Sequence, residues 1–360
     1  MDDFQTVESE PFLEVTVQLV RPTDNGADIS ALLVVSTNLP QYLRRNYSLT
    51  RTLAEFNRLH LHLMHTNSEY IGPAPPPKST NLEFVRTTLE RFLYRLSKHE
   101  HLRIVDGTRS FIESEFVFAP PQSPTVPRHV TQQRSLFSFS QTQETKEIDV
   151  FFEDAKQEVS AYEAYFSAIG RINEKIALIS RDICRSSLDV SSKLADVGLD
   201  QIPSVGVSFR KIAKCFAVDD EVLANDVWIQ YRQSVFNDQC LLFLRSNFGA
   251  QTSLNNRLKS LVSYEGSCKN TQKKMQAIER LRTSSSIRQD KVDTALEDLA
   301  DAKRTESDCR ETFKHVSDSL RKEYGRHRVE RTNDLCGILD DYVRQQLEVS
   351  KQQLSFWGTV

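Results

Sequence analysis

The sequence of 360 residues lacks the short motifs by which most enzyme classes are recognised. It contains no G-x-G-x-x-G, Walker loop, G-x-S-x-G or H-E-x-x-H pattern. Acidic pairs such as Asp219-Asp220 and Asp340-Asp341 stand in charged stretches with no apolar cleft around them, which is typical of a solvated surface. We therefore expect no catalytic residue, no enzymatic activity and no cofactor.

Cysteine is also scarce, and its spacing excludes the common metal sites. The six cysteines, at 184, 215, 240, 268, 309 and 336, stand singly without a C-x-x-C pair. HLHLMH at 60–65 is the one histidine cluster, but His60 and His62 lie about 200° apart around a helix and do not converge on one ion. We predict reduced thiols, a solvated histidine face and no metal site.

Long apolar runs and a strong charge of one sign are absent too. No apolar run approaches the roughly 20 residues of a membrane span, and the acidic start MDDFQTVESEPF lacks the basic and apolar segments of a signal peptide. A net charge of -3 gives no overall attraction to nucleic acid or anionic lipid. These features predict a cytoplasmic, helix-rich protein without a nucleic-acid partner, in which any anion binding comes from local patches.

The first third of the chain changes from a period of two to the period of a helix. Apolar and polar residues alternate from Phe12 to Val20, and PTDNGAD at 22–28 supplies the residues of a tight turn. Further on, Phe56 and Leu59 begin a helical face. We expect strands near 12–20 and 30–36, a less regular extended segment over 40–49, and helices over 54–65, 82–96 and 108–114.

Two proline-rich stretches interrupt this pattern. IGPAPPPKS at 71–79 is expected to be an extended loop, because proline fixes φ and lacks an N–H donor. Residues 117–146 combine four prolines with Ser, Thr and Gln, which predicts a linker. Inside the linker, Leu136, Phe137 and Phe139 either insert into a membrane or pack on a neighbouring domain, and their short apolar face favours packing.

From Glu147 onward the apolar residues recur at steps of three and four, as in long packing helices. The stripe breaks at VGLDQIPSVG (197–206) and at RTSSSIRQD (282–290), which predicts three helices, the second over about 208–281. Helices of about 40 to 75 residues make a rod of roughly 60 to 110 Å. Such a rod leaves more apolar stripe than it covers by itself, so we expect it to dimerise.

Several motifs resemble those of one protein family. In the last helix, SDSLRKEYGRHRVERTNDL followed by LEVSKQQLSFW is similar to the closing helix of the BAR domain in sorting nexins. NLP at 38–40, PPPK at 75–78 and LERFLYRL at 89–96 are similar to the PX domain of the same family. The resemblance implies an α+β fold: a small three-stranded PX domain with helices at 10–118, a linker at 119–146, and a three-helix BAR rod at 147–360.

This resemblance also implies a function and partners. A sorting nexin of this type dimerises through its BAR domain, lies on anionic endosomal membrane from the cytoplasmic side, and tubulates it for cargo retrieval. The implied partners are a second PX-BAR sorting nexin, in a heterodimer, and the cargo-recognition subcomplex of retromer. Two other interpretations stay open: a dimerisation scaffold without lipid contact, and a coiled-coil tether that binds membrane without curving it.

Cation-rich segments and large apolar residues are the candidates for these contacts. Clustered cations favour contact with an anionic leaflet. We expect a membrane-facing set at the turn, Arg280, Arg282, Arg288 and Lys291, and another in the last helix, Arg321, Lys322, Arg326, Arg328 and Arg331. For the second set, a solvated face paired with Glu323 and Glu330 is an equal alternative. We expect the dimer interface to contain Trp228, Tyr231, Phe236, Leu242, Phe243, Leu335, Leu339, Tyr342 and Trp357.

The resemblance gives the PX domain a phosphoinositide pocket whose usual residues are mostly missing. Such a pocket uses an arginine for the 3-phosphate, a stacking tyrosine, a second arginine, and a lysine after the proline loop. In an ungapped alignment from NLP to Phe56, these positions are held in that order by Thr52, Leu53, Val85 and Lys78. An alternative register uses Arg45 and Tyr47 but puts Phe56 out of frame. We expect a degenerate pocket, with lipid specificity supplied by the partner.

Overall fold

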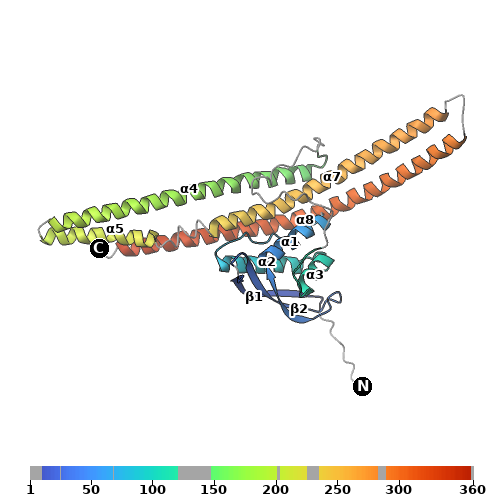
Figure 1. The fold of residues 1–360 in the computed structure, drawn as a ribbon. Coiled ribbons are helices and arrows are strands. Elements are labelled where there is room, and N and C mark those ends of the chain that lie inside the picture. Colours follow the sequence, from blue (N-terminus) through green and yellow to red (C-terminus); the bar gives the residue numbers. More distant parts are fainter. Residues whose placement is uncertain are drawn as a thin grey trace, which may run out of the picture.

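The computed structural model describes residues 10–24, 26–67, 69–120, 147–200, 203–224, 235–282 and 289–357. Figure 1 shows a small domain of strands and short helices lying against a long rod of helices. A three-stranded sheet with helices, followed by long helices, is the α+β arrangement that the sequence predicted, so the fold class is confirmed.

The sheet consists of β1 (Leu13–Pro22), β2 (Ile29–Thr37) and β3 (Asn46–Thr52), antiparallel and in that order. β1 alternates buried and exposed residues because one face meets the core and the other meets solvent. A register shift between Val17 and Leu19 marks a β-bulge. Gly26 in the β1–β2 turn has a φ of 65°, which glycine adopts without strain. The third strand covers Asn46–Thr52, whereas an extended segment was expected over 40–49. Just before it, the Arg45 carbonyl accepts from Thr37 N–H at the end of β2.

Three short helices complete this domain: α1 (Leu53–Thr66), α2 (Leu82–Lys98) and α3 (Asp106–Glu113). α1 starts directly after β3 because Thr52 caps it. The Thr52 hydroxyl accepts from Glu55 N–H, and the Glu55 carboxylate accepts from Thr52 N–H at 2.8 Å. Phe56 meets Phe92 and Phe111 edge to face, at centroid distances of 5.6 and 5.0 Å, inside the core.

The rod is built from α4 (Val150–Asp200), α5 (Pro203–Ala224), α7 (Asn237–Arg282) and α8 (Gln289–Trp357). In Figure 1, α7 and α8 run side by side to one end of the rod, and the α4–α5 hairpin reaches the other end. α8 alone has 69 residues, or about 100 Å of helix. α4 ends at Asp200 and α7 ends at Arg282, within the two stretches where the helical stripe was predicted to break, and the residues that connect them to the next helices lie outside the described ranges. The helical region expected over 208–281 is described as α5 and α7, and 225–234 lie outside the described residues.

Two apolar clusters join α4 to the α7–α8 pair. The first lies toward the start of α4 and contains Phe152, Val159, Ala250, Leu254, Leu320 and Tyr324. The second lies further along α4 and contains Phe166, Phe236, Cys240, Phe243 and Ile338. Each square ångström of apolar surface removed from water here contributes about 25 cal/mol. The three long helices are therefore held together by their own side chains near the middle of the rod.

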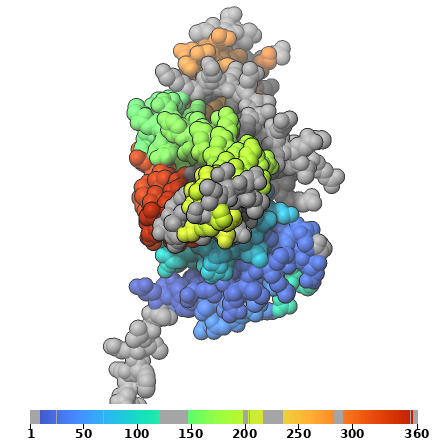
Figure 2. Space-filling view, turned by 90° about the vertical axis from the view of Figure 1, so that its left-hand side faces the viewer, coloured from blue at the N-terminus to red at the C-terminus, as the bar shows by residue number. Residues whose placement is uncertain are grey.

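Figure 2, seen from the end where α4 and α5 meet, shows the small domain on one side of the rod and α4 on the opposite side. The small domain therefore leaves most of α4 uncovered. None of the helices in the described ranges combines the length and apolar character needed to cross a bilayer.

Candidate functional sites at the domain junction and on the rod

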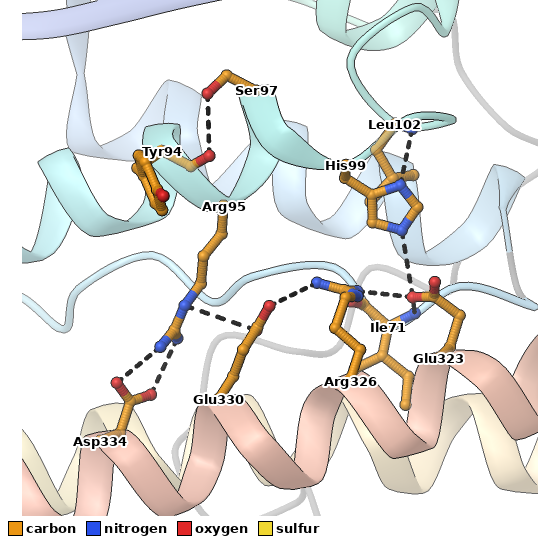
Figure 3. Close-up of polar contacts among 10 residues, drawn as sticks. All are labelled: Ile71, Tyr94, Arg95, Ser97, His99, Leu102, Glu323, Arg326, Glu330 and Asp334. Atoms are coloured by element: carbon orange, nitrogen blue, oxygen red, sulfur yellow. Dashed lines mark hydrogen bonds and ion pairs between the residues drawn. The ribbon is translucent and has the colours of Figure 1, made fainter.

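An ion-pair ladder joins α2 of the small domain to α8 of the rod (Figure 3). We use this name for the contacts of Arg91, Arg95 and His99 with Glu323, Glu330 and Asp334. Arg95 donates to both oxygens of Asp334, at 2.9 and 2.7 Å, and its Nε lies 3.5 Å from Glu330. Arg91, one turn earlier, donates to Asp334 at 3.1 Å. Side chains three and four residues apart share one helix face, so two antiparallel helices present complementary rows of charge.

The ladder ends at Glu323, which gathers donors from both domains (Figure 3). His99 Nε2 lies 3.2 Å from Glu323, Arg326 donates to it at 2.6 Å, and Ile71 N–H donates at 3.3 Å. Burial acts to raise the pKa of Glu323, but the hydrogen bonds from His99 and Arg326 outweigh burial and leave that pKa lowered. The carboxylate therefore stays ionised and holds the two domains together.

Ile71, at the start of the proline-rich loop 71–79, inserts into the rod. It is buried within the first apolar cluster of the rod. The loop packs against α7: a Cβ on Gly249 would lie at an ordinary contact distance of 3.9 Å from the carbonyl of Gly72, and Ser253 donates to the Tyr70 carbonyl at 3.2 Å. The loop predicted to be extended is thus a domain contact.

The same loop is fixed to α7 further along and covers a histidine of α1. Arg245 donates to the Pro76 carbonyl at 3.0 Å and to Asn57 at 3.3 Å. Beneath the loop His60 is buried, and burial lowers its pKa to about 4. The expectation of a solvated face is therefore wrong for His60, because the loop packs over this side of α1. Within the described ranges, no three His, Cys, Asp or Glu side chains come together as a metal site.

The cations of the last helix do not form one membrane-facing set. Arg331 is buried, pairs with Glu158 of α4 and lies 4.2 Å from the centre of the Tyr162 ring. Arg326 belongs to the domain junction. Their helix faces pack on α4 and on the small domain, so the prediction that these two arginines face a membrane is wrong. Between them His327 is buried, and its pKa is lowered to about 3, first by burial and then by Arg331 and Arg326.

Three members of that set, Arg321, Lys322 and Arg328, are exposed. Arg321 pairs with Asp149 at 2.6 Å, and Arg328 lies 3.5 Å from Glu158, so part of their charge is already neutralised. Their contact with a membrane stays a prediction.

Membrane contact by the cations at the α7–α8 end of the rod also stays a prediction. Arg280 and Arg282 end α7 with exposed side chains, and Lys291 is exposed near the start of α8. Arg288 lies outside the described residues. These cations occupy the end of the rod away from the α4–α5 hairpin (Figure 1).

α4 carries three different faces between residues 166 and 197. The face toward α5 is buried and made of small residues, namely Asn173, Ala177, Cys184 and Ser191. A second face, about 120° around the helix, is 37% to 58% exposed and consists of Ile169, Ile172, Ile176, Ile179, Ile183, Val190 and Val197. The third face is charged and includes Arg171, Glu174, Lys175, Asp182, Arg185 and Asp189. We call the second the uncovered α4 face; it has the heptad spacing of a coiled-coil seam but no partner among the residues that the structure describes.

Only some of the residues predicted to form the dimer interface are exposed on the protomer. Phe236 and Phe243 are buried in the second apolar cluster, because α7 lies between α4 and α8, so the prediction that they contact another chain is wrong. The half-buried Leu335 and Tyr342 pack against the same cluster, and Leu242 is also half-buried. Leu339 is 54% exposed and stays a candidate. The side chains of Trp228, Tyr231 and Trp357 lie outside the described part of the chain.

The positions assigned to a phosphoinositide pocket are mostly occupied by the domain itself. Leu53 and Val85, which stand where the resemblance places a stacking tyrosine and an arginine, are buried in the core, and the degenerate pocket stays a prediction. Thr52 is engaged as the cap of α1. Lys78 is exposed, and its ammonium donates to the Ala27 carbonyl at 2.9 Å.

A carboxylate of the chain lies at the start of α1, where helix N–H groups attract anions. Asp28 Oδ2 accepts from Ala54 N–H at 3.2 Å, and Asp28 Oδ1 accepts from Ile29 N–H at 2.8 Å. The corner between the sheet and α1 is therefore closed by side chains of this domain.

These features define a class of two-domain protein, in which a PX-type module is clamped to a BAR-type rod. A family model of the PX domain matches residues 41–115, and a model described as Vps5 C terminal like matches residues 243–360. The chain therefore combines a PX domain with a Vps5-like C-terminal region, and the relatives that match it along its length include sorting nexins.

Particular relatives show how far this similarity extends. Human sorting nexin-1 is 22% identical over 398 residues, covering 99% of this chain and 73% of its own length. Vacuolar protein sorting-associated protein 17 of Schizosaccharomyces pombe is 22% identical over 374 residues, covering 98% of this chain and 65% of its own. The altered pocket, and a sequence without a long insertion after PPPK, favour a resemblance to the S. pombe protein. That resemblance is found, and sorting nexin-1 matches at the same identity. The SNX-BAR Mvp1 tetramer has the same fold, with a TM-score of 0.60 at 13% identity over 96% of this chain and 99% of that one.

Sequence reasoning missed the ion-pair ladder. Its signal is present as two rows of opposite charge at helical spacing, one in LERFLYRLSKH and one from Glu323 to Asp334. Nothing local indicates that these two helices meet, so neither row predicted the contact.

Proposed function

We propose that this protein is a membrane-coat sorting nexin subunit of a retromer-type complex, which dimerises through its rod and tubulates endosomal membrane for cargo retrieval. The uncovered α4 face carries the proposal. A fully buried isoleucine or valine contributes about 1.5 to 3 kcal/mol, so covering the seven residues of this face strongly favours association. Leu339, Val343 and Leu347 of α8, each more than half exposed, extend the apolar surface. The proposed activity is that of a structural coat protein, without a catalytic step.

The partner we propose for this face is a second PX-BAR sorting nexin, and the pair then recruits the cargo-recognition subcomplex of retromer. The names of the relatives support this choice, since they are sorting nexins and a vacuolar sorting protein. The protein is cytoplasmic and peripheral on the endosomal membrane. Each exposed cation near an anionic leaflet contributes about 1 kcal/mol, which makes Arg280, Arg282 and Lys291 the first candidates for contact.

The PX domain of this chain, in our proposal, positions the rod and does not select a 3-phosphoinositide. Support comes from the corner before α1, where Asp28 accepts from Ala54 N–H and Lys78 is bound to a backbone carbonyl. A phosphate brought to this corner would meet a carboxylate of like charge. Lipid specificity then belongs to the partner.

Vesicle sedimentation followed by electron microscopy tests the proposal, with the chain alone and together with a candidate partner sorting nexin. A coat subunit binds anionic vesicles and forms tubules with its partner. A scaffold leaves the vesicles unbound, and a tether binds them without changing their shape. Charge reversal of Arg280, Arg282 and Lys291 together should lower binding, and added salt should do part of the same.

A further inference from the structure

A cleft of about 380 Å³ lies between α2 of the PX domain and helices α7 and α8 of the rod, beside the ion-pair ladder. We call it the interdomain cleft. Its apolar walls include Phe84 and Phe92 from the PX domain, and Leu242, Phe243 and Ile338 from the rod. Ligand sites are commonly cavities of about 300 to 1,000 Å³, and domain interfaces are a preferred place for them. The function proposed above gives this cleft no role.

The cleft is long. Its lining runs from Asn81 to Arg95 along α2 and from Asp334 to Gln345 along α8, which are spans of roughly 21 and 17 Å. At about 3.3 Å per residue, five or six residues of extended chain fit the same length.

At the end of the cleft away from the ladder, the lining cation Arg344 is paired at 2.7 Å with Asp340, which lies outside the lining. There Gln239 donates from its amide to Asp341 at 3.1 Å, and Asp341 forms no ion pair within the described ranges. The other amide atom, Gln239 Oε1, is buried and meets no hydrogen-bond donor in the described structure. Two acceptors side by side, one of them charged, are complementary to an ammonium or guanidinium group.

We propose that the interdomain cleft binds a short, extended peptide segment of another protein, in which a lysine or arginine stands within three residues of a large apolar side chain. The cation pairs with Asp341 and donates to Gln239 Oε1. The apolar side chain packs on Phe84, Phe243 and Ile338. The ladder holds both walls in place before the peptide arrives, so little ordering accompanies binding. The site is separate from the uncovered α4 face.

The test uses the complete chain and a phage-displayed library of random 12-residue peptides. Enriched peptides are expected to share a cation close to a large apolar residue and to bind the chain in fluorescence polarisation. Asp341→Lys should weaken them at least tenfold, about 1.4 kcal/mol. Asp340→Lys, a matched charge reversal one residue away and outside the lining, should leave binding within twofold. Peptides with glutamate in place of the cation should bind Asp341→Lys more tightly than they bind the parent chain.

A second variant tests the cleft by its volume. Thr87 is exposed, lines the cleft and has no place in the core, so Thr87→Trp should fill the space and abolish binding while the circular dichroism spectrum stays unchanged. The proposal is overturned if no peptide is enriched, if the enriched peptides carry no cation, or if Asp340→Lys and Asp341→Lys bind them equally. Binding of small apolar molecules in the cleft, with no peptide enriched from the library, would also overturn the proposal in favour of a small-molecule site.

Discussion

Arg95 on α2 and Asp334 on α8 stand 239 positions apart in the sequence and form a two-point ion pair at 2.9 and 2.7 Å. Both side chains are less than one-fifth exposed, at 17% and 18%. The pair lies at one end of the ion-pair ladder, and Ile71, bonded to Glu323, anchors the junction at the other end. A few side chains therefore set the angle between the PX domain and the rod.

Removing one member of this pair should destabilise the junction, because the other then stays partly buried without its acceptor or donor. We expect Asp334→Ala and Arg95→Ala each to lower the free energy of unfolding by about 2 kcal/mol, and the double variant to lose less than the sum. Urea unfolding followed by circular dichroism measures this. The matched control is Arg344 and Asp340, a pair that is 75% and 60% exposed, where a loss of at most about 0.5 kcal/mol is expected. Equal losses at both pairs would contradict the prediction.

The strands, short helices and turns were predictable because their signals are local. Alternation in β1, the cap at Thr52 and the break before Pro203 each act within a few residues. The pairing of α2 with α8 was not predictable, since a row of charges looks the same whether it faces water or an opposite row. The long helices were predictable only in part. Periodicity predicts that they exist, but it does not predict which helix each of their faces contacts.

Two residues show where a closer use of periodicity would have helped and where it would not. Arg331 stands seven residues after Tyr324 and seven before Ile338, so its heptad position marks it as inward, although an arginine there was taken as solvated. Ile176 continues the stripe that begins at Phe152, yet it is uncovered while Phe152 is buried. Local periodicity does not separate them: Phe236, just before α7, packs in one cluster with Phe166, and Ile176 lies ten residues further along α4.

Two buried histidines should make the protein less stable in mild acid. His60 and His327 have pKa values lowered to about 4 and about 3, mainly by burial. Below the unfolded value of about 6.5, the unfolded chain binds protons that the folded chain does not, so stability falls with pH until the folded pKa is reached. We expect a loss of about 2 kcal/mol per histidine between about pH 7 and 5. The Glu323 carboxylate, whose pKa is lowered, stays ionised over this range.

Unfolding in urea at several pH values checks this prediction. His60→Gln should reduce the dependence of stability on pH by about half, whatever it does to stability at neutral pH. His65→Gln, an exposed position on the same helix, is the matched control and should leave that dependence unchanged. A flat profile for the parent chain would show that these side chains are not buried as described.

The PX domain should not bind a soluble phosphatidylinositol 3-phosphate selectively. Calorimetric titration of the complete chain is expected to show no micromolar binding, and Lys78→Ala should change nothing. Asp28→Asn with Thr52→Arg should produce detectable binding, because the like charge is removed and a phosphate donor is added at the start of α1. Val85→Arg should instead unfold the domain, since it places a charge in the core, at a cost of several kcal/mol. Micromolar binding that survives Lys78→Ala would refute this interpretation.

The uncovered α4 face should be the contact between protomers, and a matched pair of variants separates association from folding. Ile176→Asp removes an apolar side chain of that face and adds a carboxylate that dimerisation would have to bury, so association should weaken at least a hundredfold, or about 2.7 kcal/mol. Leu178→Asp makes the same change two residues later, on the charged face of α4, where the side chain is 57% exposed.

Sedimentation velocity, with the chain alone and with a candidate partner sorting nexin, is expected to show the dimer for Leu178→Asp and the monomer for Ile176→Asp. Helix content should be equal in both variants, because neither side chain is buried within the protomer. A dimer that tolerates Ile176→Asp would show that another surface joins the protomers, and tubules formed by that monomeric variant would separate membrane bending from dimerisation.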